Sequence, residues 1–320
     1  MAGKSFRKGI TLIDLFEMFP DDDAAQTWFE SIRWPNGRVC ARCGGENTSE
    51  VPNAEPMPYW CSDCRKYFSV KFGTVMQSSK IPLRKWAIAF YQICTNLKGV
   101  SSTKLARDLG IHQGSAWHMG HRIRAAMAGD DPVFSGPVES DTTFIGGVEK
   151  NKHESRRKHQ GRGAVGKTPV AGVKDRETGK VDAKVIDHED GPTMRQFVHQ
   201  RTEPTTLVFT DEARVFNRLN RRHETVTHSV GEFVKGMAHT NGMESFWALL
   251  KRGYTGIYHW MSVKHLDRYV TEFEGRFNNR PSDTLDQMAA LVRGCIGKRL
   301  TYADLVADNG MSRTGQFGWV

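Results

Sequence analysis

The sequence predicts an α/β protein of several domains. Its 320 residues, 38% of them hydrophobic, are enough for two or three globular domains of ~100–200 residues each. Helical patterns dominate before residue 130, and strand-like runs begin at Val138. Because strands come first in this second half and then alternate with helices, we expect a mixed sheet flanked by helices rather than a bundle or a sandwich.

Charge and hydropathy limit the classes of function. Lys and Arg number 45 against 36 Asp and Glu, a formal net charge of +9, which favours a polyanionic partner, with nucleic acid as the first candidate. Membrane-surface proteins and ordinary soluble proteins can have the same balance. The chain has no run of ~18 apolar residues and no signal-peptide cleavage pattern, so we expect a cytoplasmic protein that neither spans a membrane nor is secreted.

Residues 1–35 are predicted to form a small helical lead-in. An amphipathic pattern covers residues 11–33, and Pro20 interrupts it. The acidic run Asp21–Asp23 follows this proline and can cap a second helix.

Residues 36–75 are predicted to form a zinc ribbon. Two CxxC pairs, Cys40 with Cys43 and Cys61 with Cys64, have a spacing that lets four thiolates converge tetrahedrally on one Zn²⁺. Four protein ligands leave no open position, which indicates a structural metal rather than a catalytic one. A redox-active CxxC and plain buried thiols are the alternatives.

Residues 80–130 are predicted to form a helix-turn-helix domain. After a helix that starts at Pro82, a short capped helix leads to a turn at Gly110, and a second helix ends near Ala128. A structural helical hairpin without a DNA role has the same pattern. The second helix would offer polar side chains to a DNA groove: Gln113, Ser115, His118, His121 and Arg122.

Residues 135–285 are predicted to form the mixed α/β domain, and residues 286–320 a helical tail. The strand signals lie at 138–145, 170–174, 181–186 and 206–210, and the helix signals at 192–201, 212–220, 240–252 and 263–280.

A basic insert, residues 150–167, separates the first strand from the next. It contains seven Lys or Arg against one Glu, so it cannot bury much surface. A solvated loop accounts for this composition, and so does a segment that follows a phosphate backbone. The cations considered for DNA contact are Arg156, Arg157, Lys158 and Arg162.

Three acidic residues are candidates for a second metal site. Asp141 lies on the first strand, Asp211 ends a later apolar strand, and Glu244 lies on a helix. Asn241 and Lys251 share one helical stripe with Glu244, opposite an apolar side. Such carboxylates suit Mg²⁺, which prefers oxygen ligands. Singly, each acid is more simply a surface residue or a cap, and other acids fit the same scheme: Glu139, Asp187, Glu189 and Asp190.

Taken together, these features resemble those of insertion-sequence transposases with an N-terminal zinc ribbon, a helix-turn-helix and a ribonuclease H-like DDE domain. The resemblance covers roughly residues 15–280. Besides the ribbon, the hairpin and the insert, the matching motifs are Val138-Glu-Ser-Asp141-Thr-Thr-Phe-Ile-Gly-Gly147, Thr210-Asp211-Glu, His239-Thr-Asn241-Gly-Met-Glu244-Ser-Phe-Trp247 with Lys251-Arg252, and Tyr269-Val-Thr-Glu-Phe273 with Arg276 and Asn278. One departure is Thr142, where relatives usually carry a second acid.

The resemblance implies roles for these residues. Asp141, Asp211 and Glu244 would hold two catalytic Mg²⁺ or Mn²⁺ ions, while Lys251 would contact DNA near the cut, with Arg252 beside it. Some relatives have Asn as the third member. We favour Glu244 over Asn241 as the ligand because a carboxylate offsets cation charge better than an amide, which leaves Asn241 to bond DNA or a metal-bound water.

The implied function is that of a DNA transposase that binds its element's terminal repeats and performs metal-dependent strand cleavage and strand transfer. Its partners would be double-stranded DNA, as element ends and target, and a second copy of the chain in a homodimer or higher oligomer at the nucleoid. Two other functions remain open. One is a DNA-binding regulator or domesticated transposase without catalysis, and the other is a structure-specific nuclease on the same fold.

Overall fold

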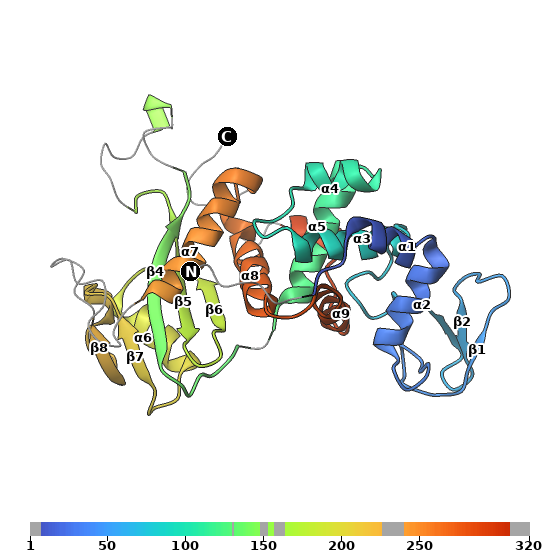
Figure 1. Ribbon diagram of the computed structural model, residues 1–320, viewed down its shortest axis with the longest axis horizontal. Helices are drawn as coiled ribbons and strands as arrows, with labels where there is room; N and C mark the ends of the chain where they lie inside the picture. Colours follow the sequence, from blue (N-terminus) through green and yellow to red (C-terminus); the bar gives the residue numbers. More distant parts are fainter. Residues whose placement is uncertain (1–7, 130, 148–152, 157–163, 226–239, 308–320) are drawn as a thin grey trace. The chain divides into compact units, whose positions relative to one another are not determined.

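The computed structural model describes residues 8–129, 131–147, 153–156, 164–225 and 240–307 (Figure 1). The chain divides into two units. The first unit comprises Met1–Ala128 and Asn279–Ala307, and the second comprises Gly129–Asn278 and Asp308–Val320. None of the described helices has the length and apolar character that a membrane crossing requires.

The first unit combines a small antiparallel sheet with a group of packed helices (Figure 1). The sheet has the strands β1 (Thr48–Glu50), β2 (Tyr59–Cys61) and β3 (Lys66–Phe68) in that order. The helices are α1 (Leu12–Met18), α2 (Asp22–Arg33), α3 (Leu83–Thr95), α4 (Ser102–Leu109), α5 (Gln113–Met127), α9 (Thr284–Cys295) and α10 (Tyr302–Val306). The Asp21 side chain accepts the Ala24 amide and so caps α2, as the acidic run predicts.

Helix α9, from the far end of the chain, completes the core of the first unit. Met288, Leu291 and Cys295 of α9 are buried in the same cluster as residues of α3 and α5. A Cβ atom at Gly294 would lie 2.2 Å from the backbone oxygen of Ala126, so α9 can approach α5 this closely only with glycine there. The helix Thr284–Cys295 is therefore part of the core of the first unit.

Helices α4 and α5 form a hairpin where the sequence predicts two helices. Ser101 caps α4 by accepting the Lys104 amide at 3.2 Å. Gly110 ends α4 with φ +57, a left-handed conformation that favours glycine.

The second unit is a mixed five-stranded sheet with helices on both faces. The strand order is β6-β5-β4-β7-β8, in which β4, β5 and β6 are antiparallel and β4, β7 and β8 are parallel. The elements are β4 (Val138–Ile145), β5 (Thr168–Asp175), β6 (Val181–Val185), α6 (Gly191–Arg201), β7 (Leu207–Thr210), β8 (Arg222–Thr225), α7 (Asn241–Gly253) and α8 (Val263–Asn279). A π-helical turn, Tyr254–Tyr258, follows α7.

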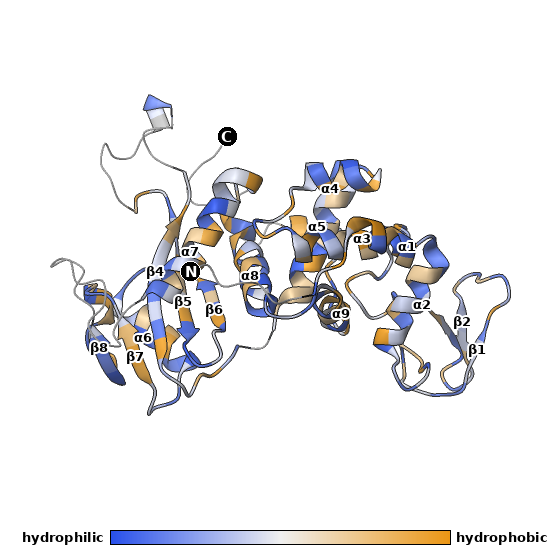
Figure 2. Ribbon diagram, in the orientation of Figure 1, coloured by the Kyte–Doolittle hydropathy of each residue, from blue (hydrophilic) through white to orange (hydrophobic). Residues whose placement is uncertain are grey.

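Alternate strand residues supply the two cores of this unit. Val170 of β5 packs with α7 and α8, whereas Ala171 and Val173 of the same strand pack with α6. This alternation is the two-residue period of a strand that is buried on both faces, and Figure 2 shows apolar and polar residues along these strands.

The predicted helix at 212–220 is wrong. Within residues 212–220 the structure has the 3₁₀ turn Arg214–Phe216, which ends at the extended Asn217. Arg218 then has a left-handed backbone (φ +62), and the polar strand β8 follows. Phe216 and Leu219 are both buried in the α6 cluster at a helix-like spacing, which explains the prediction.

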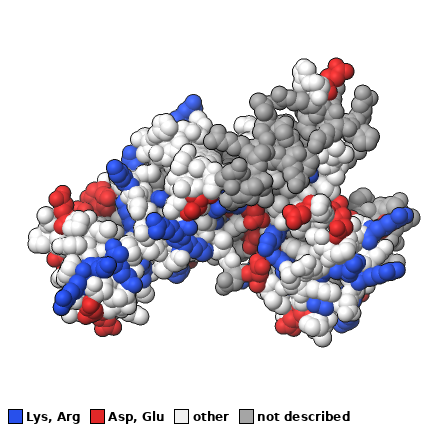
Figure 3. All heavy atoms as spheres, turned by 180° about the vertical axis from the view of Figure 1, so that it is seen from behind, with Lys and Arg blue, Asp and Glu red and all other residues white. Residues whose placement is uncertain are grey.

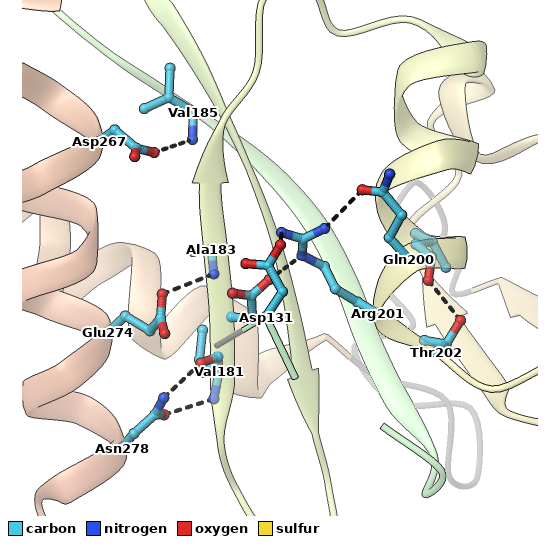
Figure 4. A network of polar contacts seen from close by, with 12 residues as sticks. Asp131, Val181, Ala183, Val185, Gln200, Arg201, Thr202, Asp267, Glu274 and Asn278 are labelled. Carbon is cyan, nitrogen blue, oxygen red and sulfur yellow. Dashed lines mark hydrogen bonds and ion pairs between the residues drawn. The ribbon is translucent and has the colours of Figure 1, made fainter. Parts of the chain in front are cut away.

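Helix α8 covers the edge strand β6 with polar side chains (Figure 4). Three of them accept backbone N–H groups of alternate β6 residues: Asp267 from Val185 (3.2 Å), Glu274 from Ala183 (3.4 Å) and Asn278 from Val181 (2.8 Å). The Asn278 amide also donates to the Val181 carbonyl at 2.7 Å. These bonds satisfy an edge that would otherwise present free strand groups.

Candidate functional site

The four cysteines of the ribbon lie together. Cys40 Sγ and Cys64 Sγ are 3.7 Å apart, as are Cys43 Sγ and Cys61 Sγ, and all four sulfur atoms lie within 4.8 Å of one another. Tetrahedral Zn–S bonds of about 2.3 Å separate their sulfurs by about 3.8 Å. The arrangement therefore fits one structural Zn²⁺ held by the four thiolates.

The backbone around the first cysteine pair has a knuckle geometry. The Arg42 amide donates to Cys40 Sγ at 3.4 Å, and Gly44 has φ +78, which favours glycine. A Cβ atom at Gly45 would lie 2.0 Å from a carboxylate oxygen of Asp63. The conformation of Gly44 favours glycine, whereas a larger residue at position 45 would have to displace the Asp63 side chain.

Asp141 lies on β4, and Asp211 directly follows the neighbouring parallel strand β7. The register of β4 with β7 pairs Val138 with Val208, and each aspartate comes three residues later. The pKa of Asp141 is raised to about 6, chiefly by burial, and the negative charges of Asp211 and Glu244 raise it further. The Asp141 carboxylate therefore lies close enough to Asp211 and Glu244 to be affected by their charges.

Trp247 of α7 forms a hydrogen bond with the Asp141 carboxylate. Its indole Nε1–H donates to Asp141 Oδ2 at 3.0 Å, and the Thr142 amide donates to Oδ1 at 2.7 Å. The β5 residue opposite Asp141 is Gly172, where a Cβ atom would lie 2.8 Å from the Trp247 ring and 2.4 Å from Met243 Cε. Glycine at this position lets α7 lie directly on the sheet beside Asp141.

Glu139 fixes the start of α7. Its side chain is 2% exposed, and its Oε2 accepts the backbone N–H of Met243 at 3.0 Å. Its Oε1 pairs with Arg176 Nε at 3.1 Å. Thr240 makes no side-chain bond at this helix end, so the sheet supplies the cap that the helix lacks.

Two further acids that suited the metal scheme on chemistry alone have other contacts. The Thr142 hydroxyl donates to Glu189 Oε1, and Asp190 caps α6 by accepting the Thr193 amide at 2.8 Å. Of the four alternative acids, Glu139, Glu189 and Asp190 thus each have a structural contact.

The exposed face of α7 carries the remaining predicted site residues. Asn241, Glu244, Lys251 and Arg252 are exposed, while the opposite side of the helix is buried, as the helical stripe predicts. Glu244 forms no ion pair with Lys251 or Arg252, both of which the structure describes. Arg252 Nε instead bonds the Ala248 carbonyl at 3.0 Å.

The acids are spread more widely than the cysteines. One oxygen of Asp211 accepts the backbone N–H of Ala213 at 3.1 Å. This local contact resembles the cap that the sequence analysis gave as an alternative role for each acid. Within the described ranges, the four cysteines are the only group of three or more candidate ligand residues with donor atoms inside 4.8 Å. Ligands shared between two ions ~3.5–4 Å apart do not need to lie that close together.

The predicted DNA contacts of the first unit differ in exposure. Gln113 is exposed and donates to Ser102 Oγ at 2.8 Å. His118 and Arg122 are half-buried, and a nitrogen of each lies 3.2 and 3.1 Å from the Leu300 carbonyl oxygen. In the insert, Arg156 ends the 3₁₀ turn Glu154–Arg156, whereas Arg157, Lys158 and Arg162 lie outside the described residues.

Sequence reasoning missed the positioning residues Trp247, Gly172 and Glu139. Glu139 precedes Asp141 by two residues, so the strand period puts both side chains on one face. Trp247 lies on the buried side of α7, three residues after Glu244. These two spacings could have indicated that Glu139 and Trp247 lie near the acids, but no nearby sequence pattern indicated a role for Gly172.

Known proteins resemble the chain over most of its length. It is 27% identical over 272 residues to a Halobacterium salinarum protein named "Uncharacterized protein in transposable element ISH50", and the match covers 81% of this chain and 91% of that protein. A chain of the simian T-cell lymphotropic virus intasome in complex with PP2A regulatory subunit B56 gamma matches 59% of this chain at 14% identity and a TM-score of 0.26. That match spans 65% of the viral complex's chain.

Two family models match separate parts of the chain. Residues 20–67 match a transposase zinc-ribbon domain, and residues 133–278 match an ISXO2-like transposase domain. The second match contains β4, β7 and α7 with their three acids. The chain is therefore similar to insertion-sequence transposases in two separate regions, a zinc-ribbon domain and an ISXO2-like transposase domain.

Proposed function

We propose that the protein is a DNA transposase that cuts and joins phosphodiester bonds at a site made by Asp141, Asp211 and Glu244. The observation that carries this proposal is the raised pKa of Asp141, which burial and the two other carboxylates cause together. A half-buried acid repelled by two more acids is a costly arrangement in the absence of a cation.

The donor set fits hard divalent cations. All three groups offer carboxylate oxygens, which Mg²⁺ and Mn²⁺ prefer, and two such ions would be held between the three side chains. When bound, they would supply activation of the attacking hydroxyl and stabilisation of the leaving oxygen. No covalent bond between enzyme and DNA is needed.

The chain's own residues orient the reacting groups. Trp247 restricts the Asp141 carboxylate, and Glu139 holds the first turn of α7, which carries both Asn241 and Glu244. Asn241 would bond DNA beside Glu244. Lys251 lies about two turns further along the exposed side of the helix and would pair with a phosphate next to the cut, with Arg252 adjacent.

We assign the ribonuclease H-like DDE fold to the second unit. The mixed sheet supports this assignment because Asp141 lies on the central strand β4 and Asp211 directly follows the adjacent parallel strand β7. The domain limits that we propose are 1–35 for the lead-in, 36–75 for the zinc ribbon, 80–130 for the helix-turn-helix domain, 135–285 for the DDE domain and 286–320 for the tail.

Besides the residues of α7, two further parts of the chain would bind DNA. The α4–α5 hairpin would bind the element's terminal repeats through residues such as Gln113, and the insert 150–167 would contact phosphates of element ends or target. The face drawn in Figure 3 carries Lys and Arg side chains on each unit, interspersed with acidic ones. Two DNA ends require two active sites, so we expect at least a dimer on DNA.

One experiment separates this function from its rivals. A labelled duplex that carries the element's own ends is incubated with the protein and Mg²⁺, and cleavage and strand-transfer products are resolved on a gel. A transposase gives both products, a structure-specific nuclease gives cleavage alone, and a DNA-binding regulator or domesticated transposase gives neither. Asp141→Asn is the matched control, because it removes one charge and keeps the shape of the side chain.

A further inference from the structure

A cavity of about 360 Å³ lies in the first unit, beside α5. One wall consists of α5 residues that include His118 and Arg122, and the other walls come from residues 77–81 and from Arg299 to Tyr302. The His118 and Tyr302 rings meet edge to face at 5.7 Å. All these segments belong to the same unit, so the cavity is formed by one packed body.

The lining of this cavity is basic. Lys80, Arg122 and Arg299 contribute three cations, several Ser, Thr and Tyr residues contribute hydroxyl groups, and no lining residue is acidic. Within the described part of the chain, no carboxylate lies within ion-pair distance of any of the three cations. The cavity thus offers hydrogen-bond donors and positive charge without a counter-ion from the protein.

Arg122 is held rigidly at this wall. Its Nε donates to the Leu300 carbonyl at 3.1 Å and contacts His118 Nε2 at 3.2 Å. The pKa of Arg122 is lowered by burial and by the charge of Arg299, and the pKa of His118 is lowered by burial and by the charge of Arg122. Like charges that repel one another around an open cavity are relieved when an anion binds between them.

We infer that this cavity binds a phosphodiester group of the DNA backbone. The inference rests on the proposed DNA-binding function and adds a defined contact to it. Guanidinium and hydroxyl donors match phosphate oxygens, and the volume is large enough to hold a phosphate with its sugar. His118 and Arg122 then position the duplex beside α5 rather than reading base edges, because phosphate contacts carry no sequence information.

The test is the salt dependence of binding to a duplex of random sequence. The double variant Lys80→Gln with Arg299→Gln removes two exposed cations of the cavity. The matched control, Lys98→Gln with Arg293→Gln, removes two exposed cations of the same unit that lie outside it. Fluorescence anisotropy over a range of salt concentrations gives the slope of log K against log salt.

The cavity variant is expected to lose about one unit of this slope, the loss of a single phosphate contact, and to bind roughly tenfold more weakly at fixed salt. The control is expected to keep the wild-type slope. Equal slopes in the cavity variant and the wild type, or an equal reduction in both variants, would overturn the inference.

A second arm uses inorganic phosphate and no DNA. Phosphate at constant ionic strength is expected to raise the thermal midpoint of the wild type and of the control, but not of the cavity variant. If phosphate has this effect while the DNA slopes stay equal, the cavity takes free phosphate and the DNA inference fails. If the wild type does not bind the random duplex, the proposed DNA function fails as well. Loss of strand transfer with the slope difference intact contradicts only the catalytic proposal.

Discussion

The indole N–H of Trp247 donates to the carboxylate of Asp141 over 3.0 Å. This bond joins the buried side of α7 to the central strand β4, so one helix both carries Glu244 and orients Asp141. A change in the seating of α7 on the sheet therefore moves two of the three acids at once.

Trp247→Phe keeps an aromatic ring at this position and removes the N–H that donates to Asp141. Because the lost bond favours the ionised form of Asp141, the variant is expected to cleave roughly tenfold more slowly and to need a higher pH for half-maximal activity. A pH profile of cleavage at saturating Mg²⁺ measures both effects. Trp260→Phe, at a half-exposed tryptophan of the same unit, is the control, and matching profiles for the two variants would refute the positioning role.

Gly172→Ala is expected to push α7 away from β5. The new Cβ would lie 2.4 Å from Met243 Cε and 2.8 Å from the Trp247 ring, and overpacking of this kind costs about 1–3 kcal/mol. Urea unfolding measures the loss. Gly256→Ala adds the same methyl group in open space and is expected to be nearly neutral, so equal losses in the two variants would show that no tight contact exists at residue 172.

Glu274 makes stability depend on pH. Burial and the charge of Asp182 raise its pKa to about 8, so between the unfolded value of about 4.3 and 8 the folded state holds a proton that the unfolded state has lost. The stabilisation from this group is present at low pH and declines as pH rises through that window. Glu274→Gln is expected to flatten the change in urea midpoint between pH 5 and pH 9. The exposed Glu203→Gln serves as the control, and an equally steep change in both variants would contradict the assignment.

The ribbon is expected to hold one zinc ion per chain. Cys43→Ser combined with Cys61→Ser removes two of the four thiolates, so elemental analysis is expected to find less than one zinc ion per chain, and proteolysis within residues 36–70 is expected to speed up. A variant with Cys94→Ser, at a buried cysteine away from the cluster, is expected to keep its zinc. Full zinc retention in the double variant would exclude the four-thiolate site.

Local patterns predicted much of the fold. The strand at 138–145 coincides with β4, and the stripe at 240–252 coincides with α7, because a period of two or of 3.6 residues is written in consecutive positions. The two CxxC pairs predicted the sulfur cluster because the spacing of metal ligands is also visible in the sequence. Each of these patterns depends only on residues that are close together along the chain.

Contacts between distant segments could not be predicted in this way. Nothing near Gly294 shows that it meets Ala126, and nothing near Gly172 shows that α7 lies over it. The 212–220 segment has the apolar spacing of a helix, but its backbone becomes extended at Asn217 and left-handed at Arg218. The orientation of His118 toward Leu300 likewise depends on a segment about 180 residues away.

The most direct test of the central claim compares Glu244→Gln with Asn241→Ala in the strand-transfer assay. Both residues lie on the exposed side of the first turn of α7, and Glu244→Gln keeps the shape while removing the charge that would offset the cations. We expect Glu244→Gln to abolish cleavage and strand transfer at saturating Mg²⁺ while end binding persists, and Asn241→Ala to lose only part of the activity. A nearly active Glu244→Gln beside an inactive Asn241→Ala would contradict the account and assign the third ligand to Asn241.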